Sequence, residues 1–102
     1  MAVKVFIERT VRKGYETYVW DMLRTLRGEA LKQRGYLYGE TWRSTQDPRT
    51  LIAVSTWGTQ AHWDMWSVSP FKLKMEERLS PMLARNPRVR IFEEYGGPQN
   101  EP

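Results

Sequence analysis

Hydrophobic and polar residues alternate near both ends of the chain. Residues 3–9 read Val-Lys-Val-Phe-Ile-Glu-Arg, and alternation with β-branched side chains is typical of a strand. Residues 88–95 alternate in the same way and predict a final strand. Two further strands are expected at residues 36–44 and 50–57, with Gln46-Asp47-Pro48 forming the turn between them.

Apolar residues recur with the helical period after the turn at Lys13-Gly14. The pattern predicts a helix that begins at Tyr15 and ends before Gly35, because glycine suits the left-handed conformation found after many helices. Its apolar stripe consists of Tyr15, Tyr18, Val19, Met22, Leu23, Leu26, Ala30 and Leu31.

Two shorter helices are predicted between the third and fourth strands. Thr59 can cap the first, which carries Trp63 and Trp66 at a spacing of one helical turn. Ser69-Pro70 is typical of an N-cap followed by proline at the first helical position. Ser80-Pro81 should kink or restart this second helix. Its apolar positions are Phe71, Met75, Leu79 and Met82.

The element order is strand, helix, strand, strand, helix, helix, strand. Right-handed crossovers fold this order into an α+β, ferredoxin-like split βαβ domain, a four-stranded antiparallel sheet with helices on one face. We expect this domain to span residues 1–95 and residues 96–102 to form a flexible C-terminal tail.

The strands are apolar on both faces. Val3, Val5 and Ile7 share one face of the first strand while Phe6 points the other way, and residues 51–54 are apolar at every position. Helices cover only one face, so the simplest cover for the other is a second copy, giving a homodimeric α+β barrel. A mildly apolar exposed sheet is the alternative.

Strand carboxylates would also point into such an interface. Glu8, Glu40 and Glu93 are then expected to pair with arginines of the same strands rather than to catalyse. The candidate partners are Arg9, Arg43 and Arg90.

The composition restricts the chemistry. A chain of 102 residues leaves a thin core, which can hardly bury 5 Trp, 5 Tyr and 3 Phe without a partner or ligand. With no cysteine, and with His62 as the only histidine, zinc–thiolate, iron–sulfur and multi-histidine sites are excluded. Trp20 is not part of the apolar stripe of the long helix, so it is expected at the surface or at an interface.

Charge and hydropathy bear on partners and location. The net charge is +4 with both signs interspersed, so we expect a solvated surface and no nucleic-acid partner. No apolar run approaches the roughly 20 residues of a membrane span, and no signal-peptide pattern opens the chain. A cytoplasmic protein without a membrane partner is expected.

The most informative segment is residues 55–71, Ser-Thr-Trp-Gly-Thr-Gln-Ala-His-Trp-Asp-Met-Trp-Ser-Val-Ser-Pro-Phe. A strand-terminal Trp, a short aromatic helix and a Ser-Pro helix start resemble the antibiotic biosynthesis monooxygenase family of dimeric α+β barrels. The opening strand, Lys13-Gly14, and Gly35-Tyr36 after a long helix also fit. The resemblance covers about residues 3–95.

The resemblance implies an oxygenase of small aromatic, phenolic or quinol substrates that uses no metal, flavin or other cofactor. The substrate would lose a proton and give an electron to O₂ in a pocket between helices and sheet. On this interpretation Trp66 is a catalytic pocket wall that faces Ile7, flanked by Phe71 and Trp63. Glu76 is the candidate catalytic carboxylate.

A haem-degrading subgroup of the same superfamily uses an Asn, a Trp and an axial His. These positions correspond here to Ile7, Trp66 and Glu76, so only the Trp is kept and haem cleavage is disfavoured. His62 is expected on the exposed side of its helix, with substrate binding as its candidate role. A non-catalytic small-ligand or haem-binding dimer remains an alternative, as does an isomerase or decarboxylase. Trp63 and Trp66 can equally be core residues.

Overall fold

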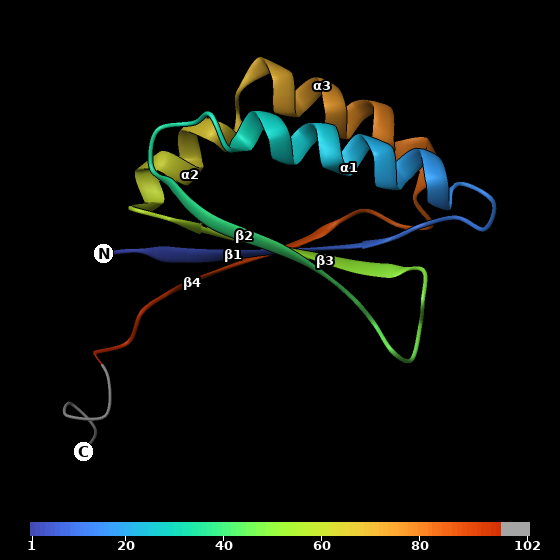
Figure 1. Cartoon of the computed structure of the whole chain (residues 1–102), viewed down its shortest axis with the longest axis horizontal. Coiled ribbons are helices and arrows are strands. Elements are labelled where there is room, and N and C mark those ends of the chain that lie inside the picture. The colour runs from blue at the N-terminus through green and yellow to red at the C-terminus, as the bar shows by residue number, and fades with distance from the viewer. Residues whose placement is uncertain (97–102) are drawn as a thin grey trace.

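The structure is a computed structural model that describes residues 1–96 of the chain (Figure 1). The expected tail lies outside the described residues, apart from Gly96. The described elements, in chain order, are β1 Val3–Thr10, α1 Glu16–Ala30, β2 Tyr36–Arg43, β3 Thr50–Trp57, α2 Gln60–Ser67, α3 Pro70–Leu79, the 3₁₀ turn η1 Ser80–Met82 and β4 Arg88–Glu93.

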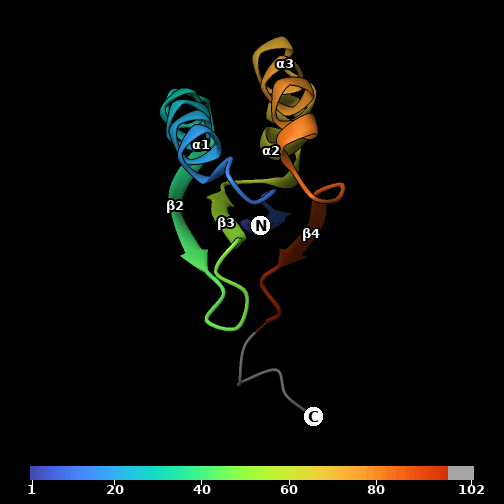
Figure 2. The same ribbon diagram turned by 90° about the vertical axis from the view of Figure 1, so that its right-hand side faces the viewer.

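The four strands form one sheet in the order β2-β3-β1-β4, and every neighbouring pair is antiparallel. All three helices cover the same face, with α1 above the β2 edge and α3 above the β4 edge (Figure 2). This is the α+β ferredoxin-like arrangement that the element order predicts. Among the described residues, no element covers the opposite face.

Alternation along β1 places its odd-numbered residues under the helices. Val3, Val5 and Ile7 are buried there, as expected, and Arg9 continues the same row. On the neighbouring strand, the indole of Trp57 is fully buried against the α2 side chain Trp63. These side chains form the floor of one hydrophobic core between sheet and helices.

The helix starts agree with the predicted caps. The Thr59 side chain accepts a hydrogen bond from the His62 amide, and the Ser69 side chain accepts one from the Lys72 amide. Proline follows Ser69 at the first helical position, and Ser80 begins the 3₁₀ turn where a kink or restart was predicted.

The end of α1 differs from the prediction. The helix stops at Ala30, because the next amides bond to carbonyls three residues back: Lys32 to Glu29 and Gln33 to Ala30. Gly35 does adopt a positive φ of 85°, but it does so inside this series of turns rather than directly after the helix.

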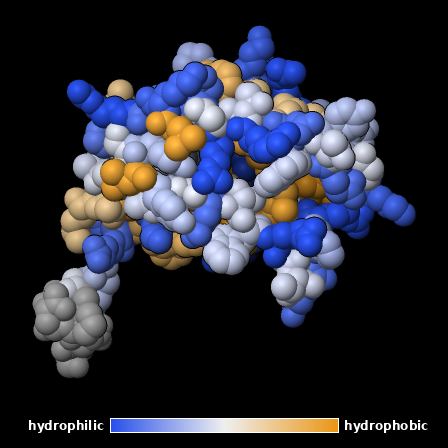
Figure 3. All heavy atoms as spheres, in the orientation of Figure 1, coloured by the Kyte–Doolittle hydropathy of each residue, from blue (hydrophilic) through white to orange (hydrophobic). Residues whose placement is uncertain are grey.

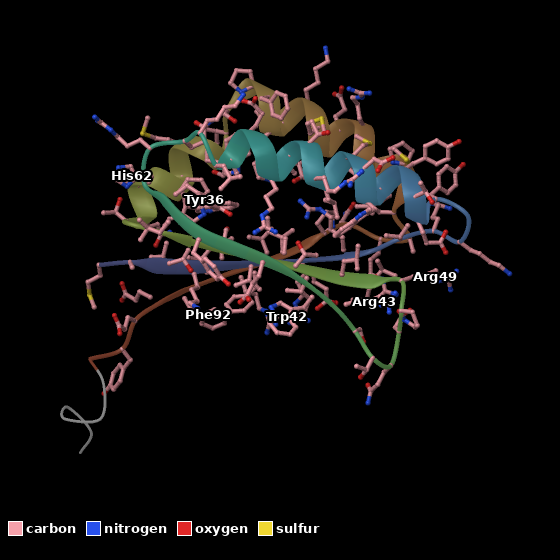
Figure 4. All side chains as sticks on the ribbon, in the orientation of Figure 1. Tyr36, Trp42, Arg43, Arg49, His62 and Phe92 are labelled. Carbon is pink, nitrogen blue, oxygen red and sulfur yellow. The ribbon has the colours of Figure 1, made fainter. Side chains whose placement is uncertain are left out.

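The open face of the sheet is rich in aromatic side chains. Trp42 and Phe92 project from it on the side opposite the helices (Figure 4), and they are 59% and 52% exposed. Phe6 packs edge-on against Phe92 with ring centroids 5.5 Å apart. The described chain therefore leaves an aromatic surface without a cover.

Candidate functional site

A cavity of about 70 Å³ lies between the helices and the sheet. Its floor includes Ile7 of β1 and Ala53 of β3, one wall is formed by Leu23 and Leu26 of α1, and Trp66 closes the α2 side. Figure 3 shows the surface hollowed between α1 and the β2 edge, with hydrophobic atoms inside the hollow. The volume holds several water molecules, well below the roughly 300 Å³ of a small ligand pocket. A cavity that holds benzene has about 150 Å³, so even a ligand of one ring requires movement at the mouth.

Aromatic rings form part of the lining of this cavity. Tyr36, Trp57 and Trp63 follow one another in edge-to-face contact, with ring centroids 5.3 and 5.9 Å apart. The indole Nε1 of Trp57 donates to Ser55 Oγ at 2.9 Å, which fixes the ring's orientation. Trp66 completes this aromatic lining, so a flat apolar ligand would find ring faces and edges there.

Arg27 and Tyr36 line the cavity beside β2. Arg27 reaches from α1 across to β2 and donates to the Gly39 carbonyl at 2.6 Å. The Tyr36 hydroxyl lies over Gly39, where a Cβ atom would overlap it. A glycine at this point of β2 is thus what lets Tyr36 lie along the strand beside the cavity.

A buried charge cluster lies beside these rings, and its two cations are part of the cavity lining. Glu76 Oε2 accepts from Arg9 Nη2 at 2.5 Å and from Lys72 Nζ at 2.7 Å. Arg9 is 2% exposed and Lys72 is 6% exposed, and both line the cavity. Lys72 Nζ also lies 5.6 Å from the centre of the Trp63 ring, a cation–π contact.

The two cations share one carboxylate oxygen, and the cluster is not fully satisfied. Arg9 Nε and Glu76 Oε1 are buried with no hydrogen-bond partner. Burial alone would raise the pKa of Glu76, but the charges of Arg9 and Lys72 outweigh it and hold that pKa below its ordinary value. Burial lowers the pKa of Lys72, and the charge of Glu76 offsets this only in part.

The structure brings together some of the residues singled out from the sequence and separates others. Ile7, Trp63 and Trp66 all line the cavity. Phe71 stacks behind Trp66, with ring centroids 6.4 Å apart, and is outside the lining. Glu76 is likewise outside the lining, behind the two cations that bind it.

His62 lies apart from the cavity, in the first turn of α2 and beside the turn that precedes β2 (Figure 4). Its Nδ1 is 3.0 Å from Thr59 Oγ1, and its ring fills the space where a Cβ of Gly35 would stand. The ring is half-buried rather than on the exposed side of the helix.

The expectation that Arg9 pairs with a strand carboxylate in an interface is wrong. Arg9 points to the helix side and binds Glu76. The sequence does contain a signal for this cluster, because Arg9 extends the alternating row of β1, and Lys72 lies on the helical stripe of Met75 and Leu79. Sequence reasoning nevertheless missed both cations as parts of a site.

The described residues were also searched for metal sites and membrane-spanning helices. Within residues 1–96, no three or more His, Asp or Glu side chains are grouped to hold a metal ion. Over the same range, no helix has the length and apolarity needed to cross a membrane.

Comparison with known proteins identifies the family of this chain. The sequence profile described as antibiotic biosynthesis monooxygenase matches residues 2–77. The chain belongs to the antibiotic biosynthesis monooxygenase family. The match includes the whole of α2 and most of α3, and therefore every residue discussed for the cavity. A search of curated protein sequences finds no significant match.

Solved structures share the fold at low sequence identity. A conserved protein from Methanosarcina mazei Go1 has a TM-score of 0.87 at 18% identity, over 93% of this chain and 94% of that one. Rv0793 from Mycobacterium tuberculosis has a TM-score of 0.85 at 14% identity, over 96% and 99%. A mutant of SnoaB, a cofactor-independent oxygenase from Streptomyces nogalater, has a TM-score of 0.81 at 12% identity, over 95% and 96%.

Proposed function

We propose that this chain is a cofactor-independent monooxygenase that acts on a small phenol or quinol bound in the cavity under α1. The observation that carries the proposal is the cavity itself, lined by tryptophan rings and, beside them, by buried cations. Membership of the family and the fold shared with a cofactor-independent oxygenase support it.

The proposed reaction takes all its electrons from the substrate. For a phenol, one oxygen atom of O₂ becomes the new carbonyl oxygen of a quinone, and the other leaves as water with the two hydrogens removed. The protein's tasks are then to bind the ring, to favour loss of its proton and to exclude bulk water. Ile7, Trp63 and Trp66 are the proposed binding surface, and Phe71 supports Trp66 from behind.

Glu76 has a different proposed role from a general base. Its Oε2 atom already accepts from two cations, and a carboxylate with a lowered pKa is a weak proton acceptor. We assign it to holding Arg9 and Lys72 in place. The same contacts leave that oxygen poorly placed to ligate haem iron, so haem degradation is not part of the proposal. His62 is proposed to support the turn at Gly35.

A homodimer that covers the open sheet face is part of the proposed functional unit. Tyr38, Trp42 and Phe92 are exposed on that face. The face also carries both signs of charge, from Lys4 to Glu40, which two copies related by a two-fold axis can pair. Burying this surface would offset the thin core of a 102-residue chain.

Oxygen uptake tests the function directly. The pure protein is incubated with a panel of monocyclic phenols, naphthoquinols and anthrones, while O₂ consumption and quinone absorbance are followed. We expect acceleration above autoxidation for at least one ring class, with small rings favoured by the cavity's size. No acceleration across the panel would defeat the oxygenase proposal, and ring binding without O₂ consumption would favour a non-catalytic binder.

Substitution of the tryptophan wall tests the site. Trp66→Ala should lower kcat/KM at least about tenfold, which corresponds to about 1.4 kcal/mol of transition-state binding. Trp66→Phe keeps a ring in place and should retain more activity. Trp20→Ala, at a residue of α1 that is 44% exposed and does not line the cavity, is the matched control and should leave turnover unchanged. Equal activity in all three variants would remove Trp66 from the site.

A further inference from the structure

The positive and negative charges of the cluster beside the cavity are not equal in number. Arg9 and Lys72 bring two positive charges, and Glu76 returns one negative charge. Of the other charged residues that line the cavity, Arg27 is exposed to solvent, and the Glu40 side chain alternates to the open face of the sheet, so neither balances the buried cluster. One positive charge is therefore left in a site from which most water is excluded.

An uncompensated charge of this kind is costly in a protein interior. Removing an ion from water costs several kcal/mol unless a counter-charge and hydrogen bonds replace the lost hydration. Arg9 is buried and its Nε has no partner, while the Lys72 ammonium donates to the same Glu76 oxygen that Arg9 already uses. The cluster is therefore one negative charge short, and its Arg9 Nε donor and Glu76 Oε1 acceptor both lack a partner.

The missing group has a defined chemistry. It must bring a single negative charge, because the excess is one, and it must be small, because the cavity volume is about 70 Å³. It must also carry an apolar body, since Ile7 and the tryptophan rings form the rest of the lining. A single aromatic ring with one ionised oxygen meets the conditions of charge and apolar body, and it is the smallest aromatic body that movement at the mouth would have to admit.

We propose that Arg9 and Lys72 form a binding site for the ionised oxygen of a phenolate or enolate ligand, with the ring of the ligand against Trp63 and Trp66. The inference deepens the proposed function, on which it rests for the identity of this ligand as substrate. It supplies the step that oxygenation needs, since the site favours ArO⁻ over ArOH and the released proton passes to water. No strong general base is then required.

The test is an anaerobic spectrophotometric titration with 4-nitrophenol, whose phenolate absorbs in the visible range. At saturating protein, the apparent pKa of the bound probe should fall by about one unit or more relative to the free probe, which is about a tenfold shift toward phenolate. Lys72→Met should abolish most of this shift and weaken phenolate binding about tenfold. Lys74→Met is the matched control, an exposed lysine of the same helix, and should behave as the wild type.

Two further measurements separate a charge effect from a loss of structure. Lys72→Met leaves a neutral Arg9–Glu76 pair, so the variant should fold, which circular dichroism checks. 4-Nitroanisole cannot ionise and should bind the wild type and Lys72→Met equally. Should Lys72→Met fail to fold, Lys72→Gln removes the same charge while it keeps a hydrogen-bond donor that can reach Glu76, and it should lose the pKa shift in the same way.

A bound probe that titrates as the free probe does, or a folded Lys72→Met variant that retains the shift, would overturn the inference. Because no O₂ is present, this outcome is independent of catalysis. A lowered pKa together with no oxygen uptake supports the anion site and counts against the oxygenase. Oxygen uptake without a lowered pKa supports the oxygenase and counts against the anion site.

Discussion

At the scale of single residues, the distinctive feature is one carboxylate that serves two buried cations. Glu76 lies at the centre of the cluster and is the only negative charge bonded to Arg9 and Lys72 among the described residues. Removing one partner of a buried ion pair is costly, because the remaining charges keep their burial but lose their compensation. Glu76 should therefore matter more to stability than either cation does alone.

The first consequence is a pH-dependent contribution to stability. The pKa of Glu76 is lower in the folded state than its ordinary value, so folding is favoured while Glu76 is ionised in both states. This contribution is fully present above about pH 4.3, the ordinary glutamate pKa, and is lost as the pH falls through the lower folded-state value. Urea unfolding from pH 7 to pH 3 should show Glu76→Gln less stable than the wild type by about 3 kcal/mol at pH 7, with the difference shrinking in acid.

Glu77→Gln is the control for this measurement. Glu77 is the exposed neighbour of Glu76 on α3, and its substitution should change the free energy of unfolding by no more than about 0.5 kcal/mol. If Glu76→Gln and Glu77→Gln gave the same pH profile, the cluster would not contribute to folding in the way described.

At this scale the sequence predicted the apolar half of the cavity better than the polar half. Ile7, Trp63 and Trp66 were predicted because periodicity and the family resemblance point to them, and the structure brings them to one cavity. Arg9 and Lys72 were missed because a charged side chain is ordinarily solvated. Only the joint geometry of β1 and α3, which no local pattern contains, shows that two cations meet over one carboxylate.

At the scale of elements, the turn between α1 and β2 is held by a glycine fitted against a histidine. Gly35 has φ 85°, and its carbonyl accepts from the Gly58 amide at 2.7 Å, which ties this turn to the start of α2. The His62 ring occupies the space beside the Gly35 Cα. Two separate constraints, one on conformation and one on space, thus act on the same residue.

Comparing two glycines separates these constraints. Gly14 also has a positive φ, 95°, but a Cβ there would meet nothing within 4 Å, so Gly14→Ala should cost only about 1 kcal/mol for conformation. Gly35→Ala should cost about 1–3 kcal/mol more, because the added Cβ overlaps His62. Thermal or urea unfolding measures both values.

The double variant Gly35→Ala with His62→Ala identifies the cause. It should recover the part of the loss that comes from overlap and leave the conformational part. A loss in Gly35→Ala that is no larger than that in Gly14→Ala would contradict the proposed role of His62 as a support for the turn.

The elements themselves were largely predictable, because their ends carry local signals. Thr59 and Ser69 cap their helices as their side chains suggest, and Pro70 takes the first helical position. The end of α1 was not predictable from periodicity. Leu31 continues the apolar stripe in the sequence, yet it is 58% exposed in a turn, because the chain has already left the helical path.

At the scale of the whole molecule, one face of the sheet packs against the helices in the hydrophobic core, and no described element packs against the other face. The register between β1 and β3 shows how this division arises. Ile7 pairs with Ala53, and both side chains lie on the helix side, whereas Phe6 pairs with Val54, and both lie on the open side. The alternation was readable from the sequence. What covers the open face was not, because a single chain's pattern carries no information on the partner's identity.

A charge placed at the centre of the open face tests the proposed dimer. Sedimentation should give the mass of two chains for the wild type at micromolar concentration. Phe6→Glu should give the mass of one chain, since removing the new carboxylate from water in the interface costs about 3 kcal/mol or more even beside Arg90, about a hundredfold in Kd. The single chain should tolerate the change, because Phe6 lies opposite Arg90 on β4.

Met65→Glu is the control for this substitution, since Met65 lies on α2 and is 72% exposed. It introduces the same charge on the helix side of the molecule and should leave the mass unchanged. A wild type that sediments as a single chain, or a Phe6→Glu variant that stays dimeric, would refute assembly through this face.

The distribution of the indoles has a practical consequence. Trp57, Trp63 and Trp66 surround the cavity, whereas Trp20 and Trp42 are exposed. Intrinsic fluorescence therefore has two sources, an interior one shielded from aqueous quenchers and a surface one open to them. A ring entering the cavity would perturb the shielded emission, and a partner on the sheet would shield Trp42, so the molecule carries an optical reporter for each of its two proposed contacts.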